Sequence, residues 1–230
     1  MMGLTHGESE ALLLSLSVAW RSLLISLPPA VGFAWLLTRR RFVGRTLLDA
    51  LVHLPIVLPP VAVGYVLLLL FGTRGFIGAW LEHWFGIVLV FTRNGAALAT
   101  AVMTFPVMVR AIRISLENVD RGLEDAARTL GAHPLDRFAT ITVPLMLPGL
   151  LAGAIMAFSA ALGEFGAVIT FVSNIPGQTR TLPLALYSAL QEPGGEHSAA
   201  RLAVLSVLLG LTGLLLSEWF ARRVRRLLGR

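Results

Sequence analysis

The sequence contains no cysteine and no lysine. Without cysteine the chain can form no disulfide, no thiolate metal site and no cysteine nucleophile. Without lysine it lacks the residue that a phosphate-binding P-loop requires, so we do not expect it to bind ATP in that way. Charge is also scarce, because only 14% of the 230 residues are charged, whereas a soluble domain carries about 25%. These shortages favour a chain that lies largely in lipid.

Apolar residues make up 56% of the chain, and its mean hydropathy is +0.77. A helix that spans a bilayer needs about 20 mostly apolar residues. Five segments meet this requirement: 22–38, 50–72, 95–117, 145–171 and 199–221. Residues 9–20 either extend the first of these helices or lie at the membrane interface. We therefore predict an all-α, polytopic transmembrane helix bundle that forms one domain over residues 1–230, with five spans and a six-span alternative.

Two further apolar segments are less suited to spanning. Residues 76–91 include Glu82 and His83, and residues 181–190 follow Arg180 directly. Each is too short or too polar, so external or re-entrant helices are the better interpretation. The N-terminus also differs from a cleaved signal peptide, because Glu8 precedes the first apolar run and arginines follow it, where a small-residue cleavage site is expected.

The arginines indicate how the chain is oriented. Cytoplasmic loops of membrane proteins collect Arg and Lys. With five spans, 14 of the 19 basic residues fall on one side; these are Arg39, Arg40, Arg41, Arg45, Arg110, Arg113, Arg121, Arg128, Arg137, Arg222, Arg223, Arg225, Arg226 and Arg230. We expect loops 39–49 and 118–140 and the C-terminus in the cytoplasm, and the N-terminus outside. Because the arginines lie between apolar runs, the net charge of +6 predicts membrane topology rather than a nucleic-acid partner.

The loop between the third and fourth spans carries a distinctive pattern. Residues 124–128 are compatible with a short helix, and Gly131 is a plausible helix stop. The alanines at 126 and 127 would give that helix a small face against which another protein can pack. Gly131 is followed by nine residues and then by the sequence Ile141-Thr142-Val143-Pro144.

This pattern resembles the EAA loop of ABC importer permeases, which has E-A-A, three residues, G, nine residues and then I-x-L-P. The spacing matches throughout, although Asp125 stands in place of Glu and Val143 in place of Leu. The resemblance implies that loop 118–144 carries a coupling helix that docks in a cytoplasmic ATPase. The residues that it assigns to this coupling are Glu124, Asp125, Ala126, Ala127, Gly131, Ile141 and Pro144.

Two longer stretches, 54–72 and 161–191, resemble the molybdate/tungstate and sulfate/thiosulfate permeases of type I ABC importers. The compact length is most similar to the molybdate branch. The resemblance implies a homodimer in the bacterial inner membrane, with two ABC ATPase subunits and an extracytoplasmic oxyanion-binding protein. ATP and Mg would bind the ATPase, and this chain would hold no cofactor or metal and catalyse no reaction. Molybdate is the favoured substrate, with tungstate, sulfate and thiosulfate as alternatives.

Glu164 is an ionisable residue in the predicted fourth span. Such residues cost roughly 2.5–3.5 kcal/mol to insert and face the bundle interior or a cavity. Because a carboxylate repels an oxyanion, we interpret Glu164 as a structural or gating group, paired with an arginine or capped by hydroxyls. Gly163 and Gly166 beside it could allow a close helix crossing.

Uncharged polar residues could line a pathway that passes a dianion without trapping it. The candidates are Thr104, Ser159 and Thr170, and the alternative is that each hydroxyl bonds its own helix backbone. Ser173 and Asn174 lie in a turn that would face outside, where they are candidate contacts for the binding protein.

Two other classes of function are less consistent with the sequence. An intramembrane enzyme would need catalytic groups clustered on facing helices, and only Glu164 is clearly ionisable within a predicted span. A channel or secondary transporter would work without ATP, but it leaves the coupling-like loop unexplained.

Overall fold

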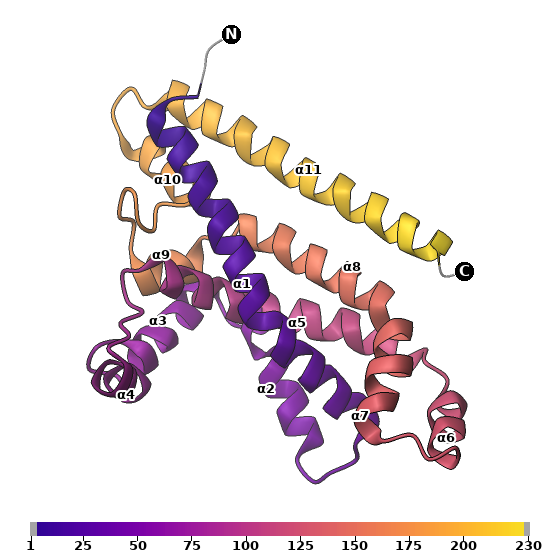
Figure 1. The fold of residues 1–230 in the computed structure, drawn as a ribbon. Helices are drawn as coiled ribbons and strands as arrows, with labels where there is room; N and C mark the ends of the chain where they lie inside the picture. Colours follow the sequence, from indigo (N-terminus) through magenta and orange to yellow (C-terminus); the bar gives the residue numbers. More distant parts are fainter. Residues whose placement is uncertain (1–3, 228–230) are drawn as a thin grey trace.

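The computed structural model describes residues 4–227, without the side chains of Arg121, Ser217, Glu218 and residues 220–227. The described part consists of helices and their connecting loops and contains no strand (Figure 1). Its elements are α1 His6–Arg39, α2 Arg45–Val57, α3 Pro60–Phe71, α4 Phe76–Phe85, α5 Arg93–Glu117, α6 Arg121–Thr129, α7 Pro134–Arg137, the π-helical segment η1 Phe138–Thr142, α8 Val143–Leu162, α9 Gly166–Val172, α10 Leu182–Gln191 and α11 Glu196–Leu227.

Four helical stretches of the described chain are long and apolar enough to cross a membrane. These are His6–Arg39, Arg93–Glu117, the continuous stretch Pro134–Leu162, and Glu196–Leu216. The pair α2 and α3 passes the same test when it is taken as one broken span, which gives five. The predicted all-α bundle is therefore confirmed, with four spans, or the predicted five if α2 and α3 form one broken span; no sixth candidate span occurs among residues 4–227.

The first span is longer than the apolar core of the sequence suggests. Residues 9–20 extend it, so that α1 runs for 34 residues. It begins with a capping box, in which Glu8 N donates to Thr5 Oγ1 at 3.3 Å and Thr5 N donates to Glu8 Oε2 at 2.8 Å. Such reciprocal bonds satisfy two backbone N–H groups that a helix start leaves without partners.

The second span is broken at its prolines. The chain bends by 116° between helices α2 and α3. Leu58, which precedes Pro59, has an extended backbone with ψ 147°, because a residue before proline is disfavoured in the helical region. Pro60 then opens α3 at its first position, where its missing N–H costs nothing.

The fourth predicted span, 145–171, is wrong in both of its boundaries. The helix continues from α7 through η1 into α8 and ends at Leu162, and a separate helix α9 follows after residues 163–165. Glu164 therefore lies in the break between two helices and not inside a span. The break is stabilised locally, because the Glu164 carboxylate accepts the N–H of Ala167 and so caps the new helix.

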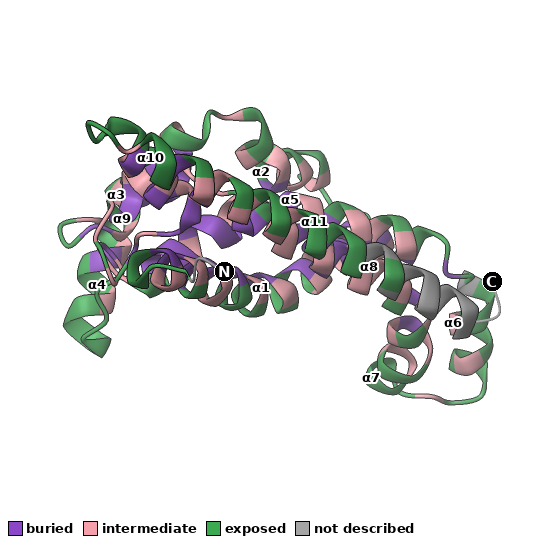
Figure 2. Cartoon of the chain, turned by 90° about the horizontal axis from the view of Figure 1, so that it is seen from above, coloured by how far each residue is buried: buried purple, intermediate pink, exposed green. Residues whose placement is uncertain are grey.

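Helices α4 and α10 have ten residues each. At 1.5 Å per residue such a helix is about 15 Å long, half the thickness of the hydrocarbon core of a bilayer. The prediction that these segments do not span is thus consistent with their lengths. Figure 2 shows α4 projecting from the bundle with an exposed surface, which includes Phe76, Trp80 and Trp84.

Helix α5 forms the centre of the bundle, packed against α1, α8, α9 and α2. Small residues allow this close packing, since Ala96, Ala97 and Ala99 are fully buried. At Gly149 of α8, an added Cβ would lie 2.1 Å from the Cβ of Ser115 in α5. Helix α11, by contrast, lies on the outside against α8 and exposes a row of apolar side chains to its surroundings (Figure 2); these include Val204, Val207, Leu208, Leu211, Leu214 and Leu215.

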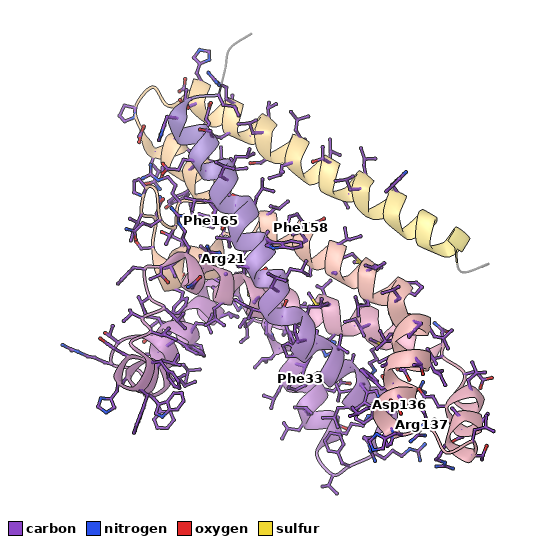
Figure 3. The ribbon with its side chains drawn as sticks, in the orientation of Figure 1. Arg21, Phe33, Asp136, Arg137, Phe158 and Phe165 are labelled. Carbon is purple, nitrogen blue, oxygen red and sulfur yellow. The ribbon has the colours of Figure 1, made fainter. Side chains whose placement is uncertain are left out.

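Arginines of the two predicted groups lie at different levels of the bundle. At one end Arg39 pairs with Glu124 of α6, and Arg113 pairs with Asp49 of α2. Arg201 pairs with Glu8 where α1 begins, whereas Arg21 donates to Asn94 about midway along α1 (Figure 3). Arg39 and Arg113 thus lie together at the α6 end, Arg201 lies at the other end, and Arg21 belongs to neither end. The arginines of the tail lie outside the described side chains and residues.

Candidate functional site

The candidate coupling site is built on α6, whose two ends are defined by local hydrogen bonds. Asp120 caps its start by accepting the N–H of Gly122 at 2.8 Å. At its end Gly131 N donates to Arg128 O and Ala132 N donates to Ala127 O. This pair of bonds is a Schellman motif, which needs a left-handed residue, and Gly131 supplies it with a φ of +84°. The predicted helix stop at Gly131 is confirmed.

The surface of α6 is apolar in part and is left uncovered. None of the side chains described for this helix is buried. Leu123 is 49% exposed, Leu130 is 88% exposed, and Ala126 is exposed between them in sequence. Apolar side chains that gather on an exposed helix are typical of a surface that binds another protein.

The two adjacent acids of this helix point in different directions. Glu124 Oε1 accepts from Arg39 Nη2 at 3.1 Å and from Thr142 Oγ1 at 2.8 Å. Asp125 is 64% exposed in its side chain and makes only a loose pair with Arg128 at 3.7 Å, an interaction worth about 0–1 kcal/mol. The structure thus leaves Asp125 available to a partner, while Glu124 is committed to contacts within the chain.

The last two coupling candidates belong to the membrane helix that follows. Ile141 lies half-buried in η1, and Pro144 is exposed in the first turn of α8. Figure 3 shows Asp136 and Arg137 of α7 beside α6, at the same end of the molecule. A short connection therefore joins the exposed helix α6 to the helical stretch α7–η1–α8, which is long enough to span the membrane.

The candidate pathway residues do not form one polar surface within this chain. Thr104 is buried in α5 and donates to Thr100 O at 2.9 Å, and Thr170 donates to Gly166 O in α9 at 2.8 Å. Both thus follow the alternative in which the hydroxyl bonds its own helix. Ser159 has a buried hydroxyl without a hydrogen bond among the described residues, and it lies against α11 where an added Cβ at Gly213 would be 3.1 Å away.

The three residues around the α8–α9 break behave differently. Glu164 Oε1 accepts the N–H of Ala167 at 2.9 Å, so its partner is a backbone group rather than the expected arginine or hydroxyl. At Gly166 an added Cβ would lie 2.7 Å from Pro60 Cβ in α3, whereas at Gly163 only Ala160 O is near, at 3.8 Å. The expected close crossing is present at Gly166 and absent at Gly163.

We expect Glu164→Gln to retain the fold and Glu164→Ala to weaken it by about 1 kcal/mol, the usual value of a helix cap. The glutamine carbonyl can still accept the N–H of Ala167, and alanine cannot. Thermal unfolding of the purified chain in detergent measures both variants. Equal destabilisation by glutamine and alanine would show instead that the charge itself is required.

The two candidate contacts for a binding protein are not equivalent. Asn174 is used inside the chain, because it donates to Ser188 Oγ at 2.7 Å and accepts from Arg180 Nε at 3.0 Å. Ser173 is exposed and has a left-handed φ of 63°. Of the two, only Ser173 is exposed.

Several residues of structural consequence gave no signal in the sequence. Ser15, buried in the middle of α1, accepts the N–H of Leu182 at 2.7 Å and so caps α10. Arg39 and Thr142 contact Glu124 from positions 85 and 18 residues away. Such contacts depend on the packing of distant helices, which no local spacing reveals.

The family described as "Binding-protein-dependent transport system inner membrane component" matches residues 30–226. The chain belongs to this family. It is therefore an integral membrane subunit of a transporter and not an enzyme, and the exposed helix α6 lies within the matched region.

Among curated relatives, the chain is 58% identical over 229 residues to "Molybdenum transport system permease protein ModB" of Escherichia coli (strain K12), with full coverage of both chains. It is 54% identical over 222 residues to the protein of the same name from Haemophilus influenzae, with 96% of this chain and 97% of that protein covered. "Sulfate transport system permease protein CysT" of Escherichia coli (strain K12) is more distant, at 41% identity over 83% of this chain and 70% of the relative.

Solved structures have the same fold at low sequence identity. A bacterial alginate ABC transporter, in complex with its alginate pentasaccharide-bound periplasmic protein, matches 96% of this chain and 80% of that chain, with a TM-score of 0.76 and 16% identity. The MetNI methionine ABC transporter in inward-facing conformations matches 95% of this chain and 94% of that chain, with a TM-score of 0.67 and 17% identity. The bundle is thus the fold of an ABC transporter permease.

Proposed function

We propose that this chain is the membrane-spanning subunit of an ATP-driven importer that moves molybdate into the cytoplasm. The observation that carries the proposal is the full-length identity of 58% to a molybdenum transport permease. The sulfate permease is both less similar and only partly covered by this chain. Tungstate, sulfate and thiosulfate are the alternative substrates.

The proposed assembly contains two copies of this chain, two ABC ATPase subunits and one extracytoplasmic oxyanion-binding protein. ATP and Mg²⁺ would bind the ATPase subunits, and this chain would carry no cofactor. The loop 118–144 would be the coupling segment, with α6 facing the ATPase. Its exposed Leu123 and Leu130 and the outward-facing Asp125 support this role, because a helix without apolar packing of its own needs a partner surface.

The proposed orientation places the N-terminus outside and α6, loop 39–49 and the C-terminus in the cytoplasm of a bacterial cell. The segregation of arginines supports it, since Arg39 and Arg113 lie at the α6 end and cytoplasmic loops collect such residues. The apolar surface of α11 supports burial of that helix against lipid or the second copy.

The experiment that tests this function is ATP-driven uptake by the complex of this chain with its ATPase, reconstituted in lipid vesicles. The binding protein is added outside with molybdate, tungstate or sulfate in turn. We expect uptake and stimulated ATP hydrolysis with molybdate, and neither when ADP replaces ATP. Stimulation by sulfate but not by molybdate would overturn the substrate, and uptake without ATP would overturn the importer.

A further inference from the structure

The proposed coupling helix α6 has almost no apolar anchor on the rest of its own chain. None of its described side chains is buried, and its leucines at 123 and 130 are exposed. A helix that transmits movement must nevertheless move together with the membrane spans. The polar contacts of α6 therefore determine whether a displacement of this helix also moves the membrane-spanning helices.

Those contacts converge on one residue, whose backbone oxygen accepts from Arg137 Nη1 of α7 at 3.5 Å and whose carboxylate accepts two further hydrogen bonds. Glu124 Oε1 accepts from Arg39 Nη2 at 3.1 Å and from Thr142 Oγ1 at 2.8 Å. Arg39 is the last residue of α1, and Thr142 is the last residue of η1, immediately before α8. Glu124 thus joins α6 to two different membrane helices through a single oxygen atom.

The burial of the two donors makes this junction stiff. The side chain of Arg39 is 8% exposed and that of Glu124 is 21% exposed, and Thr142 is 2% exposed. Arg39 also donates to Val119 O at 3.4 Å, in the connection between α5 and α6. A buried charge that loses its partner is strongly destabilised, so Arg39 and Glu124 are expected to stay together while the surrounding helices move.

We propose that Glu124, Arg39 and Thr142 are positioning residues that fix the coupling helix to α1 and α8, so that movement imposed on α6 by the ATPase displaces these spans as one body. The proposal rests on the function proposed above. It divides the two acids of α6 by role: Asp125 faces the partner, and Glu124 transmits the movement inward. Breaking the Glu124 contacts would then allow ATP hydrolysis with less anion import, while the complex stays assembled.

The test uses the reconstituted complex with its binding protein and molybdate, and it compares Glu124→Ala, which removes the acceptor of both hydrogen bonds, Thr142→Val and the double variant. The readouts are the ATPase that co-purifies, the rate of ATP hydrolysis, and the number of anions imported per ATP. We expect normal co-purification and, in each single variant, about ten-fold fewer anions per ATP, which is the factor that one hydrogen bond to a charged group represents. The double variant should be little worse than the worse single variant, because both changes break one junction.

Thr140→Val is the matched control. Thr140 lies in the same η1 segment, but its hydroxyl donates to Asp136 O within its own helix. Its loss should leave the number of anions per ATP unchanged. Asp125→Asn should instead lower the amount of ATPase that co-purifies.

Three results would overturn the proposal. Unchanged anions per ATP in both single variants would show that the junction transmits nothing. A proportional fall in hydrolysis and uptake would indicate a structural role alone, and loss of co-purification would place Glu124 in the ATPase contact. If the Glu124→Ala variant does not fold, the Thr142→Val variant alone tests the proposal. A wild-type complex that imports no oxyanion refutes the proposed function and this proposal with it, whereas an active wild type with unaffected variants refutes this proposal alone.

Discussion

Gly64→Ala is expected to abolish transport and to destabilise the purified chain by about 1–3 kcal/mol, the range found for overpacked cores. An added Cβ at Gly64 of α3 would lie 2.7 Å from Ala167 O and 3.0 Å from Ala167 Cα. These are backbone atoms, so α9 would have to shift as a whole. That shift is opposed by the packing of α9, since Ala167, Val168 and Phe171 are fully buried.

Thermal unfolding in detergent and ATP-driven uptake in vesicles measure the two effects. Gly32→Ala is the matched control, because Gly32 also lies inside a helix but an added Cβ there has no atom within 4 Å. Alanine is a better helix former than glycine by about 0.5–1 kcal/mol, so the control should be neutral or slightly stabilised. A Gly64→Ala variant that is as stable and active as the Gly32→Ala variant would show that α3 and α9 are not held in close contact.

The α8–α9 segment, predicted as one span over residues 145–171, illustrates what the sequence could predict and what it could not. Hydropathy predicted apolar character through residue 171 correctly, but it could not distinguish one long helix from two short ones. The distinction depends on a cap made by Glu164 and on the approach of Gly166 to Pro60. The cap is a bond between residues three positions apart, and the approach joins segments about a hundred residues apart, but neither alters the local hydropathy.

For helix α6, by contrast, local residue types were enough to predict the secondary structure. The helix and its stop at Gly131 followed from residue types at short spacing, since a Schellman motif is completed within a few residues. The sequence also placed Glu124 and Asp125 together as coupling residues. Only the structure separates them, because Arg39 and Thr142 come from other elements and bind just one of the two acids.

The Gly131 position offers a test of whether the backbone or the surface of the coupling segment matters. Gly131 has a φ of +84°, and an added Cβ would have no atom of this chain within 4 Å. A left-handed conformation costs most non-glycine residues about 1–2 kcal/mol, and asparagine tolerates it better than alanine or valine. We therefore expect uptake to fall in the order Asn, Ala, Val, with valine losing about 5- to 30-fold or more.

The measurement is the number of anions imported per ATP, together with co-purification of the ATPase. A docking surface limited by bulk alone predicts a different order, in which alanine is tolerated better than the larger asparagine. The matched control is the same series at Gly44, which has a φ of +92° and equally open space but lies between α1 and α2. Strain there should lower stability without changing the anions imported per ATP. If the Gly44 series uncouples hydrolysis from uptake as strongly as the Gly131 series, then backbone strain anywhere at this end suffices and α6 has no special role in coupling.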